Sequence, residues 1–264
     1  MNNRPSFNQP ISRMMRKVPE ITAIFWIVKL LSTAMGEATS DFFVFKINPY
    51  LAVCLGGVGL LVALLIQFYL PRYRPWAYWL AVVMVAVFGT MAADVLHIQF
   101  GVPYLVSTSL FAIILVVVFI VWYKTERTLS IHSINTRRRE LFYWATVLAT
   151  FALGTAAGDM TATTLGLGYF SSALLFIGLI LIPILGYWWF NMNEITAFWI
   201  AYVLTRPIGA SFADWMGKSK SVGGLGWGNG HVSIVLTIII IIFVGYMMLS
   251  RKESRRERIP LHRQ

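Results

Sequence analysis

The sequence predicts an all-α polytopic membrane protein with eight transmembrane helices, built from four parallel two-helix repeats, with both termini in the cytoplasm. Three observations support this fold class. The chain is strongly apolar along almost its whole length, its basic residues gather on one side of the predicted spans, and one spacing of Trp, Gly and Asp recurs four times.

The composition is that of a membrane protein. Of the 264 residues, 58% are hydrophobic and only 12% are charged, and the mean hydropathy is +0.69. A soluble domain carries about twice that charged fraction. A membrane-spanning helix needs roughly 20 mostly apolar residues. Stretches of this kind lie at about 20–40, 50–70, 76–95, 104–123, 141–159, 169–190, 194–213 and 231–250.

These stretches divide the chain into a basic N-tail (1–18), a membrane domain (19–250) and a basic C-tail (251–264). The N-tail is polar, and no small-residue cleavage site follows the first apolar run. We therefore expect a retained first span and not a cleaved signal peptide. The single cysteine, Cys54, excludes a disulfide within the chain.

The net charge of +11 is explained by topology. With the N-terminus in the cytoplasm, 17 of the 22 Lys and Arg residues lie on the cytoplasmic side and three lie outside. This asymmetry follows the positive-inside rule. It predicts cytoplasmic termini and a lipid bilayer as the surroundings, and it argues against a nucleic-acid partner.

The Trp–Gly–Asp spacing defines the repeats. Each copy has a Trp, a Gly ten residues later and an Asp five residues after that, and all four aspartates of the chain belong to it. The copies are Trp26–Gly36–Asp41, Trp79–Gly89–Asp94, Trp144–Gly154–Asp159 and Trp199–Gly209–Asp214. The repeats extend over about 19–70, 71–123, 137–190 and 192–250. Because two spans return the chain to its starting side, all repeats share one orientation.

Four tandem repeats, each with two spans and a characteristic Trp, resemble a bacterial integral-membrane family known mainly by that repeat and of unknown function. The resemblance covers about residues 19–250. It implies a multi-pass protein of the bacterial inner membrane, and it brings no reaction or ligand with it. The cofactor is unknown, and no tightly bound cofactor is expected.

The repeat glycines and tryptophans have structural interpretations. Each Gly is followed four residues later by another small residue, a spacing that lets membrane helices approach closely. We therefore predict helix packing at Gly36, Gly89, Gly154 and Gly209. The tryptophans lie near the cytoplasmic ends of the odd spans, so we interpret them mostly as interfacial anchors, and as packing residues wherever they are buried between helices.

The aspartates are the main functional candidates. Each lies 15 residues after its Trp, about 22 Å along a helix, and therefore near the outer face. One interpretation is that Asp41, Asp94, Asp159 and Asp214 converge and bind or pass a cation, since ionisable residues at membrane depth are commonly functional. The other is that each aspartate caps a short helix in an outer loop. We favour the first.

Other charged residues modify this cluster. Glu37 lies beside Gly36 and extends the acidic group, while Lys29 and Arg206 lie inside spans and are candidate counter-charges or gating residues. Pro207 is expected to kink or break the seventh span. His97 follows Asp94 by three residues and is a further candidate metal ligand beside the four aspartates. Oxygen ligands predominate, which favours Mn²⁺, Mg²⁺, Ca²⁺ or protons over copper or zinc. An organic cation held among aromatic side chains is an equally physical alternative.

Three functions compete at this point. We favour a small-cation transporter or channel, and therefore a protein that is not an enzyme and has no catalytic residue. The first alternative is an intramembrane metal-dependent hydrolase using Asp94, His97, Asp159 and His231, although neither a paired-histidine motif nor a nucleophile elbow is present. The second alternative is a non-transporting scaffold or sensor. A homo-oligomer is compatible with the sequence.

Overall fold

The structure is a computed structural model, and it describes residues 16–256. In this part of the chain eight long α-helices account for most residues, and no strand occurs. They are α2 (Ala23–Lys46), α3 (Pro49–Tyr69), α4 (Pro75–Ile98), α5 (Tyr104–Glu126), α6 (Arg137–Asp159), α7 (Tyr169–Trp189), α8 (Glu194–Gly217) and α9 (Asn229–Arg256). The prediction of an all-α fold with eight helices is confirmed.

Three short helical turns lie between the long helices. They are η1 (Ile131–Ser133), η2 (Met160–Thr164), which is a π-helical turn continuing α6, and η3 (Lys220–Val222). The tails predicted at 1–18 and 251–264 lie mostly outside the described residues. Of the described parts, Lys17 and Val18 are buried against the helices, and α9 continues to Arg256.

Seven of the eight helices, α3 to α9, are long and apolar enough to cross a membrane. The exception is α2, whose sequence contains Lys29, Glu37 and Asp41. All three side chains are nevertheless buried. Helix α2 can carry these charges because it lies in the interior of the bundle, where other helices surround it.

Local sequence signals set where several helices begin. The side chains of Thr22, Asn48, Thr136 and Asn193 each accept a hydrogen bond from a backbone N–H in the first turn of the helix that follows. These N-caps satisfy backbone donors that the helix itself leaves unpaired. Helices α3 and α4 also begin with a proline, which suits the first helical turn.

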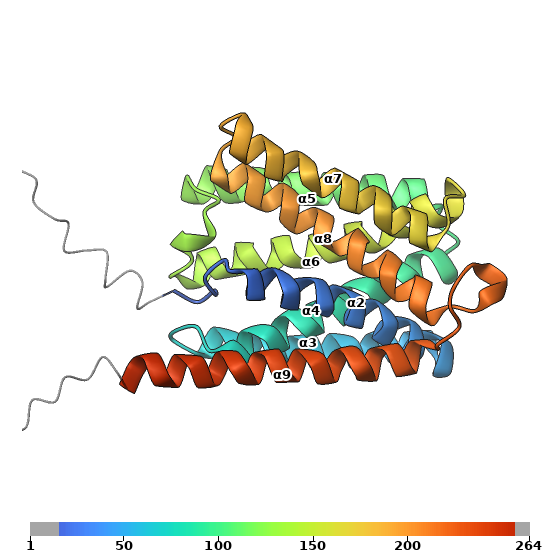
Figure 1. Cartoon of the computed structure of the whole chain (residues 1–264), viewed down its shortest axis with the longest axis horizontal. Coiled ribbons are helices and arrows are strands. Elements are labelled where there is room, and N and C mark those ends of the chain that lie inside the picture. The colour runs from blue at the N-terminus through green and yellow to red at the C-terminus, as the bar shows by residue number, and fades with distance from the viewer. Residues whose placement is uncertain (1–15, 257–264) are drawn as a thin grey trace, which may run out of the picture.

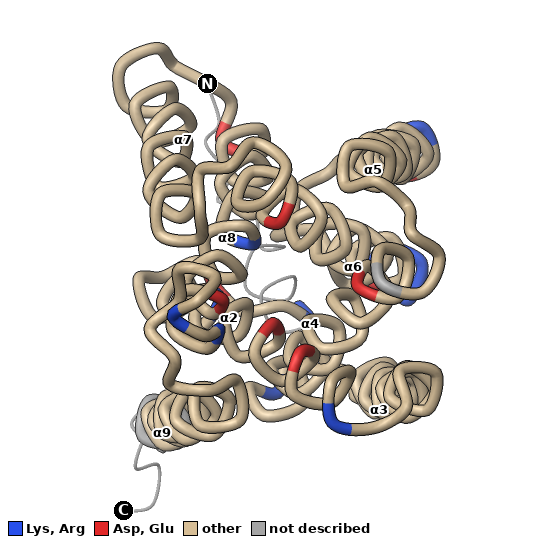
Figure 2. Tube along the Cα trace, turned by 90° about the vertical axis from the view of Figure 1, so that its right-hand side faces the viewer, with Lys and Arg blue, Asp and Glu red and all other residues tan. Residues whose placement is uncertain are grey.

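The helices form two concentric layers, seen along the bundle in Figure 2. An inner bundle consists of α2, α4, α6 and α8, in which α2 neighbours α4, α4 neighbours α6, α6 neighbours α8 and α8 neighbours α2. Outside it, α3 packs on α4, α5 on α6, α7 on α8, and α9 on α2. Each outer helix therefore packs chiefly on the inner helix of the next repeat, and the fourth repeat closes the ring onto the first.

Burial separates the two layers. In the inner helices 61% of the α4 and α8 spans and 67% of the α6 span are buried, against 28% of α3 and α7 and 17% of α5 and α9. The exposed faces of the outer helices carry large apolar side chains such as Leu61, Ile113 and Ile242. Such a surface fits lipid, because the hydrocarbon core of a bilayer favours apolar side chains.

The repeat glycines mark the contacts between neighbouring inner helices. A Cβ on Gly36 would lie 2.9 Å from the carbonyl carbon of Ala86, closer than packed atoms approach. The other three glycines make corresponding contacts, and in every case the contacted residue lies three positions before the glycine of its own helix. The four pairs are Gly36–Ala86, Gly89–Phe151, Gly154–Arg206 and Gly209–Thr33.

Three of the repeat tryptophans lie in the core. Trp79, Trp144 and Trp199 are each at most 5% exposed, and the indole Nε1 of Trp199 donates to the Leu129 carbonyl oxygen at 2.9 Å. Trp26 is partly buried. Trp79, Trp144 and Trp199 are therefore packing residues between helices, the second of the two roles expected for the repeat tryptophans, and the anchor role does not apply to these three.

Pro207 does not break its helix, so of the kink or break expected from the sequence the break is wrong. Helix α8 runs without interruption from Glu194 to Gly217 with Pro207 inside it. On the neighbouring helix Gly154 leaves room for the proline ring, since a Cβ there would lie 3.2 Å from Pro207 Cδ. The irregular backbone lies instead in the third repeat, where the π-turn η2 follows Asp159.

Candidate functional site

The four repeat aspartates lie at one end of the inner bundle. Each occupies the same position of its repeat, and the inner helices run in the same direction, so equal spacing brings the side chains to the same level. We call this the aspartate end; it is opposite the end at which α2 begins and α9 finishes (Figure 1). All four carboxylates are buried: Asp41, Asp94, Asp159 and Asp214 are at most 8% exposed.

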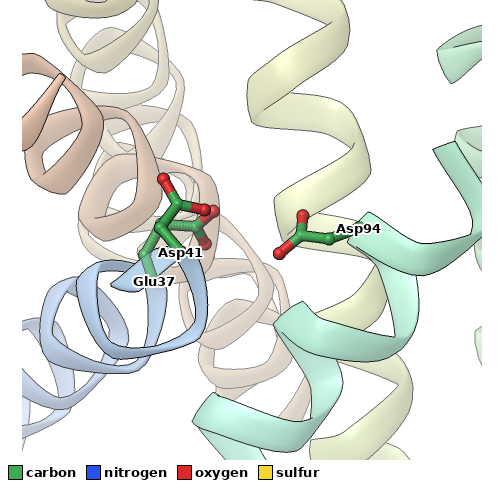
Figure 3. Close-up of side chains that lie close together, drawn as sticks. All are labelled: Glu37, Asp41 and Asp94. Atoms are coloured by element: carbon green, nitrogen blue, oxygen red, sulfur yellow. The ribbon is translucent and has the colours of Figure 1, made fainter. Parts of the chain in front are cut away.

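Three carboxylates form a compact group, which Figure 3 shows. Glu37 and Asp41 lie one turn apart on α2, and Asp94 reaches toward them from α4. One oxygen atom from each of the three lies within 4.8 Å of the other two. The Ser40 hydroxyl donates to Asp94 Oδ2 at 2.9 Å. Carboxylates this close repel one another when ionised, unless a cation or protons compensate them.

Lys218 places an ammonium group beside this cluster. Its Nζ lies 3.0 Å from Asp214 Oδ1 and 3.7 Å from Asp41 Oδ2, and 4.9 Å from the centre of the Tyr169 ring. Burial by itself lowers the pKa of Lys218, but the carboxylates of Asp214, Asp41 and Asp159 outweigh it and hold that pKa well above its ordinary value. Asp159 and Asp214 thus belong to the same electrostatic environment, although neither is in the group of three.

Sequence reasoning missed Lys218 and also Asn229. The predicted topology puts Lys218 in an outer loop, yet it follows Asp214 by four residues, a spacing that puts two side chains on one helical face. Asn229, the first residue of α9, donates from Nδ2 to Asp41 Oδ2 at 3.0 Å. No signal in the sequence connects Asn229 to Asp41, because the two residues are 188 positions apart.

Arg206 forms a buried ion pair with Glu37, one of the three clustered carboxylates, in the space between the four inner helices. Arg206 Nη2 donates to Glu37 Oε2 at 3.0 Å and to Thr155 Oγ1 at 2.8 Å, and it also donates to Thr90 Oγ1. Arg206 Nη1 donates to the Thr33 carbonyl oxygen at 2.9 Å. Breaking such a pair by removing one partner is costly, because a buried charge is left without compensation.

The repeat organises this ion pair. Glu37, Thr90 and Thr155 are the residues that follow the repeat glycine on α2, α4 and α6, so one sequence position supplies three of the groups around the guanidinium. The hydroxyls of Thr90 and Thr155 also donate to Glu37 Oε2, at 3.3 and 3.1 Å. Arg206 comes from the fourth helix and fills the space between them.

Lys29 lies away from the carboxylates. Its Nζ is 4.1 Å from the ring centres of both Phe151 and Tyr202, and within the described residues no hydrogen-bond partner reaches it. Arg206 lies over the same Phe151 ring, with Cζ 4.7 Å from its centre. Cations over aromatic faces are attracted by the ring quadrupole. Of the two predicted counter-charges, only Arg206 pairs with a carboxylate in the part of the chain that the structure describes.

The two histidines considered as ligands are turned away from the cluster. His97 Nδ1 lies 2.9 Å from the Val102 carbonyl oxygen, and Nε2 lies 3.2 Å from Ser107 Oγ. His231 is exposed, and its Nδ1 lies 3.1 Å from the Trp227 carbonyl oxygen. The suggestion of His97 as a metal ligand is corrected, because both of its ring nitrogens are engaged by the loop between α4 and α5 and the start of α5.

The capping interpretation of the aspartates is also wrong. Asp41, Asp94 and Asp214 lie inside α2, α4 and α8, each of which continues beyond its aspartate. Asp159 precedes the π-turn η2, but its side chain makes no capping hydrogen bond there.

The group of three offers the chemistry of a hard-cation site. Carboxylate oxygens are the ligands that Mg²⁺, Mn²⁺ and Ca²⁺ prefer, and these ions take at least six oxygens. Glu37, Asp41 and Asp94 would provide part of such a shell, and water would complete it. Glu37 would serve both the cation and Arg206, since each of its oxygens has more than one lone pair.

The repeat also places the chain among known sequences. The family described as Repeat of Unknown Function (DUF347) matches residues 77–128, 142–193 and 197–253, together more than half of the chain. The matches coincide with the second, third and fourth two-helix units. The first unit, which the match does not cover, has the same helix pair. It is the only unit with charged residues at the repeat positions of Lys29 and Glu37. No curated protein and no solved structure matches the chain. Its three matched repeats show that the chain belongs to the Repeat of Unknown Function (DUF347) family.

Proposed function

We propose that this protein is a transporter of small cations in the bacterial inner membrane, with both termini in the cytoplasm. Its binding site consists of Glu37, Asp41 and Asp94, with Asp159 and Asp214 close by. The observation that carries the proposal is the burial of three carboxylates whose oxygens lie within 4.8 Å of one another. Buried carboxylates at this distance are stable only when a cation or bound protons compensate their negative charge.

The charges along the bundle axis support this proposal. Among the described residues, the aspartate end and the axis hold five carboxylates, but only three cationic side chains, Lys218, Arg206 and Lys29. With every group ionised, two negative charges remain among buried side chains. One divalent cation or two protons would compensate them. A divalent metal ion, with or without proton exchange, is therefore the substrate class we propose.

The filled axis supports a carrier more than an open channel. A network of direct hydrogen bonds fills the space between the four inner helices. It consists of Arg206, Glu37, Thr90 and Thr155. A cation bound at the aspartate end cannot continue along the axis while this network is closed. Transport would then require the inner helices to shift, as in alternating access.

The competing functions receive less support. The hydrolase alternative uses His97 and His231 together with the carboxylates, but the hydrogen bonds of both ring Nδ1 atoms go to backbone carbonyls, those of Val102 and Trp227. A scaffold that binds no cation would not need a buried acidic group, because such a group lowers stability unless it is compensated.

The proposal is tested by reconstituting the purified protein into liposomes that contain a fluorescent dye. Mn²⁺ that enters the liposomes quenches the fluorescence of this dye. We expect Mn²⁺ uptake by the unaltered protein and its loss in the Asp94→Asn variant. Glu194→Gln is the matched control, because it removes a carboxylate that is 66% exposed at the other end of the bundle. Correctly reconstituted protein without any cation flux, over the ions Mn²⁺, Mg²⁺ and Ca²⁺, would refute transport.

A further inference from the structure

We infer that the Lys218 ammonium is a tethered competitor at Asp41, one of the three carboxylates of the cation site, and that an incoming cation must displace it from there. This inference rests on the proposed function and adds the way in which the site is held closed. Lys218 brings an ammonium group to two carboxylates, Asp214 and Asp41, that belong to different helices. Asp41 also belongs to the group of three, so a cation bound to Glu37, Asp41 and Asp94 would compete with the Lys218 ammonium for the Asp41 oxygens.

The loop after α8 is built to deliver Lys218. Residues 218–228 fold back over the last turn of α8, where the N–H groups of Leu225, Gly226 and Gly228 donate to the carbonyls of Trp215, Lys218 and Gly217. Gly226 and Gly228 have φ angles of +78° and +83°, which only glycine adopts readily. The two ends of the loop bring Lys218 and Asn229 to the same oxygen of Asp41, Oδ2.

Among the cationic side chains of the site, Lys218 is the one that can leave. Its side chain is 24% exposed, whereas Arg206 is fully buried and held by hydrogen bonds to three other helices. The long, flexible stem of a lysine lets the ammonium move to solvent, and the incoming cation would then compensate the carboxylate charge that the ammonium leaves behind. Arg206 has no such route, so it remains as a fixed charge.

The other repeats lack this cation. The residues four positions after Asp41, Asp94 and Asp159 are Phe45, Ile98 and Thr163. Among the described residues, the ring of aspartates therefore has a single displaceable occupant, contributed by the fourth repeat. A divalent ion has twice the charge of an ammonium group and binds several carboxylate oxygens at once, so it is the class of competitor that can replace Lys218.

The first test measures Mn²⁺ binding to the full-length protein in detergent by calorimetry. Lys218→Met keeps the apolar stem and removes the competing ammonium, so we expect the Kd for Mn²⁺ to fall about tenfold, as it does when a competing state is removed. Lys220→Met is the matched control in the same loop and should leave the Kd unchanged. An unchanged Kd in Lys218→Met would overturn the inference.

The second test separates displacement from a general effect of charge. Acetylation of lysines by a water-soluble amine reagent is followed by mass spectrometry, with Lys220 as the internal standard. We expect Lys218 to react slowly without Mn²⁺, faster with saturating Mn²⁺, and equally fast in the Asp41→Asn/Asp214→Asn variant without Mn²⁺. A Lys218 reactivity that Mn²⁺ does not change would show that the ammonium stays in place, against the inference.

The two proposals fail in different ways. If Mn²⁺ binds and Asp94→Asn abolishes binding, while Lys218→Met changes neither the Kd nor the labelling pattern, the cation site stands and the displacement of Lys218 is wrong. If neither the unaltered protein nor Lys218→Met binds Mn²⁺, Mg²⁺ or Ca²⁺, both proposals are wrong.

Discussion

Arg206 on α8 lies in the space that Gly154 leaves open on α6. A Cβ at position 154 would be 2.5 Å from Arg206 Cβ, so any side chain there would push the arginine away from the bundle axis. The same arginine makes the ion pair with Glu37. The close packing of the repeat glycines and the charge network on the axis therefore depend on one another.

This relationship predicts that Gly154→Ala destabilises the protein. Forcing extra volume into a packed interior costs about 1–3 kcal/mol, and we expect the melting temperature in detergent to fall by several degrees. Gly178→Ala is the matched control, because nothing lies within 4 Å of a Cβ built there and alanine favours helix more than glycine does. Equal melting temperatures for the two variants would contradict the packing of Arg206 against Gly154.

The Arg206–Glu37 pair predicts a non-additive result. Arg206→Met leaves Glu37 buried with only hydroxyl donors, and removing one partner of a buried pair costs about 3–5 kcal/mol. Glu37→Gln in the same chain removes the unpaired charge, so the double variant should be more stable than Arg206→Met alone. Thermal unfolding of both single variants and the double variant gives this comparison, and a double variant less stable than either single one would show that the two side chains act independently.

The carboxylates are predicted to differ in importance for cation binding. Asp94→Asn removes an oxygen donor from the group of three, whereas Asp159→Asn changes a carboxylate outside that group. We expect the first to weaken Mn²⁺ binding at least tenfold and the second by a smaller factor, about threefold, through charge alone. Calorimetric titration of the two variants provides the measurement. A larger loss in Asp159→Asn would place the ion in the other half of the ring.

The raised pKa of Lys218 predicts how its contribution to stability depends on pH. Because the pKa is higher in the folded protein than the unfolded value of about 10.4, the ion pairs stabilise the protein fully below about that pH and lose their effect as the pH rises through the folded pKa. The difference in melting temperature between the unaltered protein and Lys218→Met should therefore be constant from about pH 7 to 9 and shrink only above about pH 10. A difference that already disappears between pH 7 and 9 would show that the lysine is not held by the carboxylates.

Some of these features follow from the amino-acid sequence alone. The number of long helices follows from apolar length, and the repeat frame follows from the recurring Trp–Gly–Asp spacing. A fixed spacing on helices that run in one direction also places Asp41, Asp94, Asp159 and Asp214 at one level, because helical rise is constant. These properties depend only on the order and spacing of residues along the chain, so they can be read from the sequence.

Lateral neighbours depend on tertiary packing, and the sequence could not supply them. Periodicity shows which face of a helix is special, but not which other helix covers it. The closure of α9 onto α2, the meeting of Arg206 with Glu37, and the contact of Asn229 with Asp41 all join the two ends of the chain.

His97 is a case in which spacing along the chain suggested a contact that the structure does not make. It follows Asp94 by three residues, yet α4 ends at Ile98, and the following turn takes the imidazole to Val102 and Ser107 instead of to the carboxylates. Composition and spacing determined the helices and the level of the acidic residues. Packing between distant helices decided which charges meet, because contacts across the bundle depend on how whole helices fit together and not on spacing within any one of them.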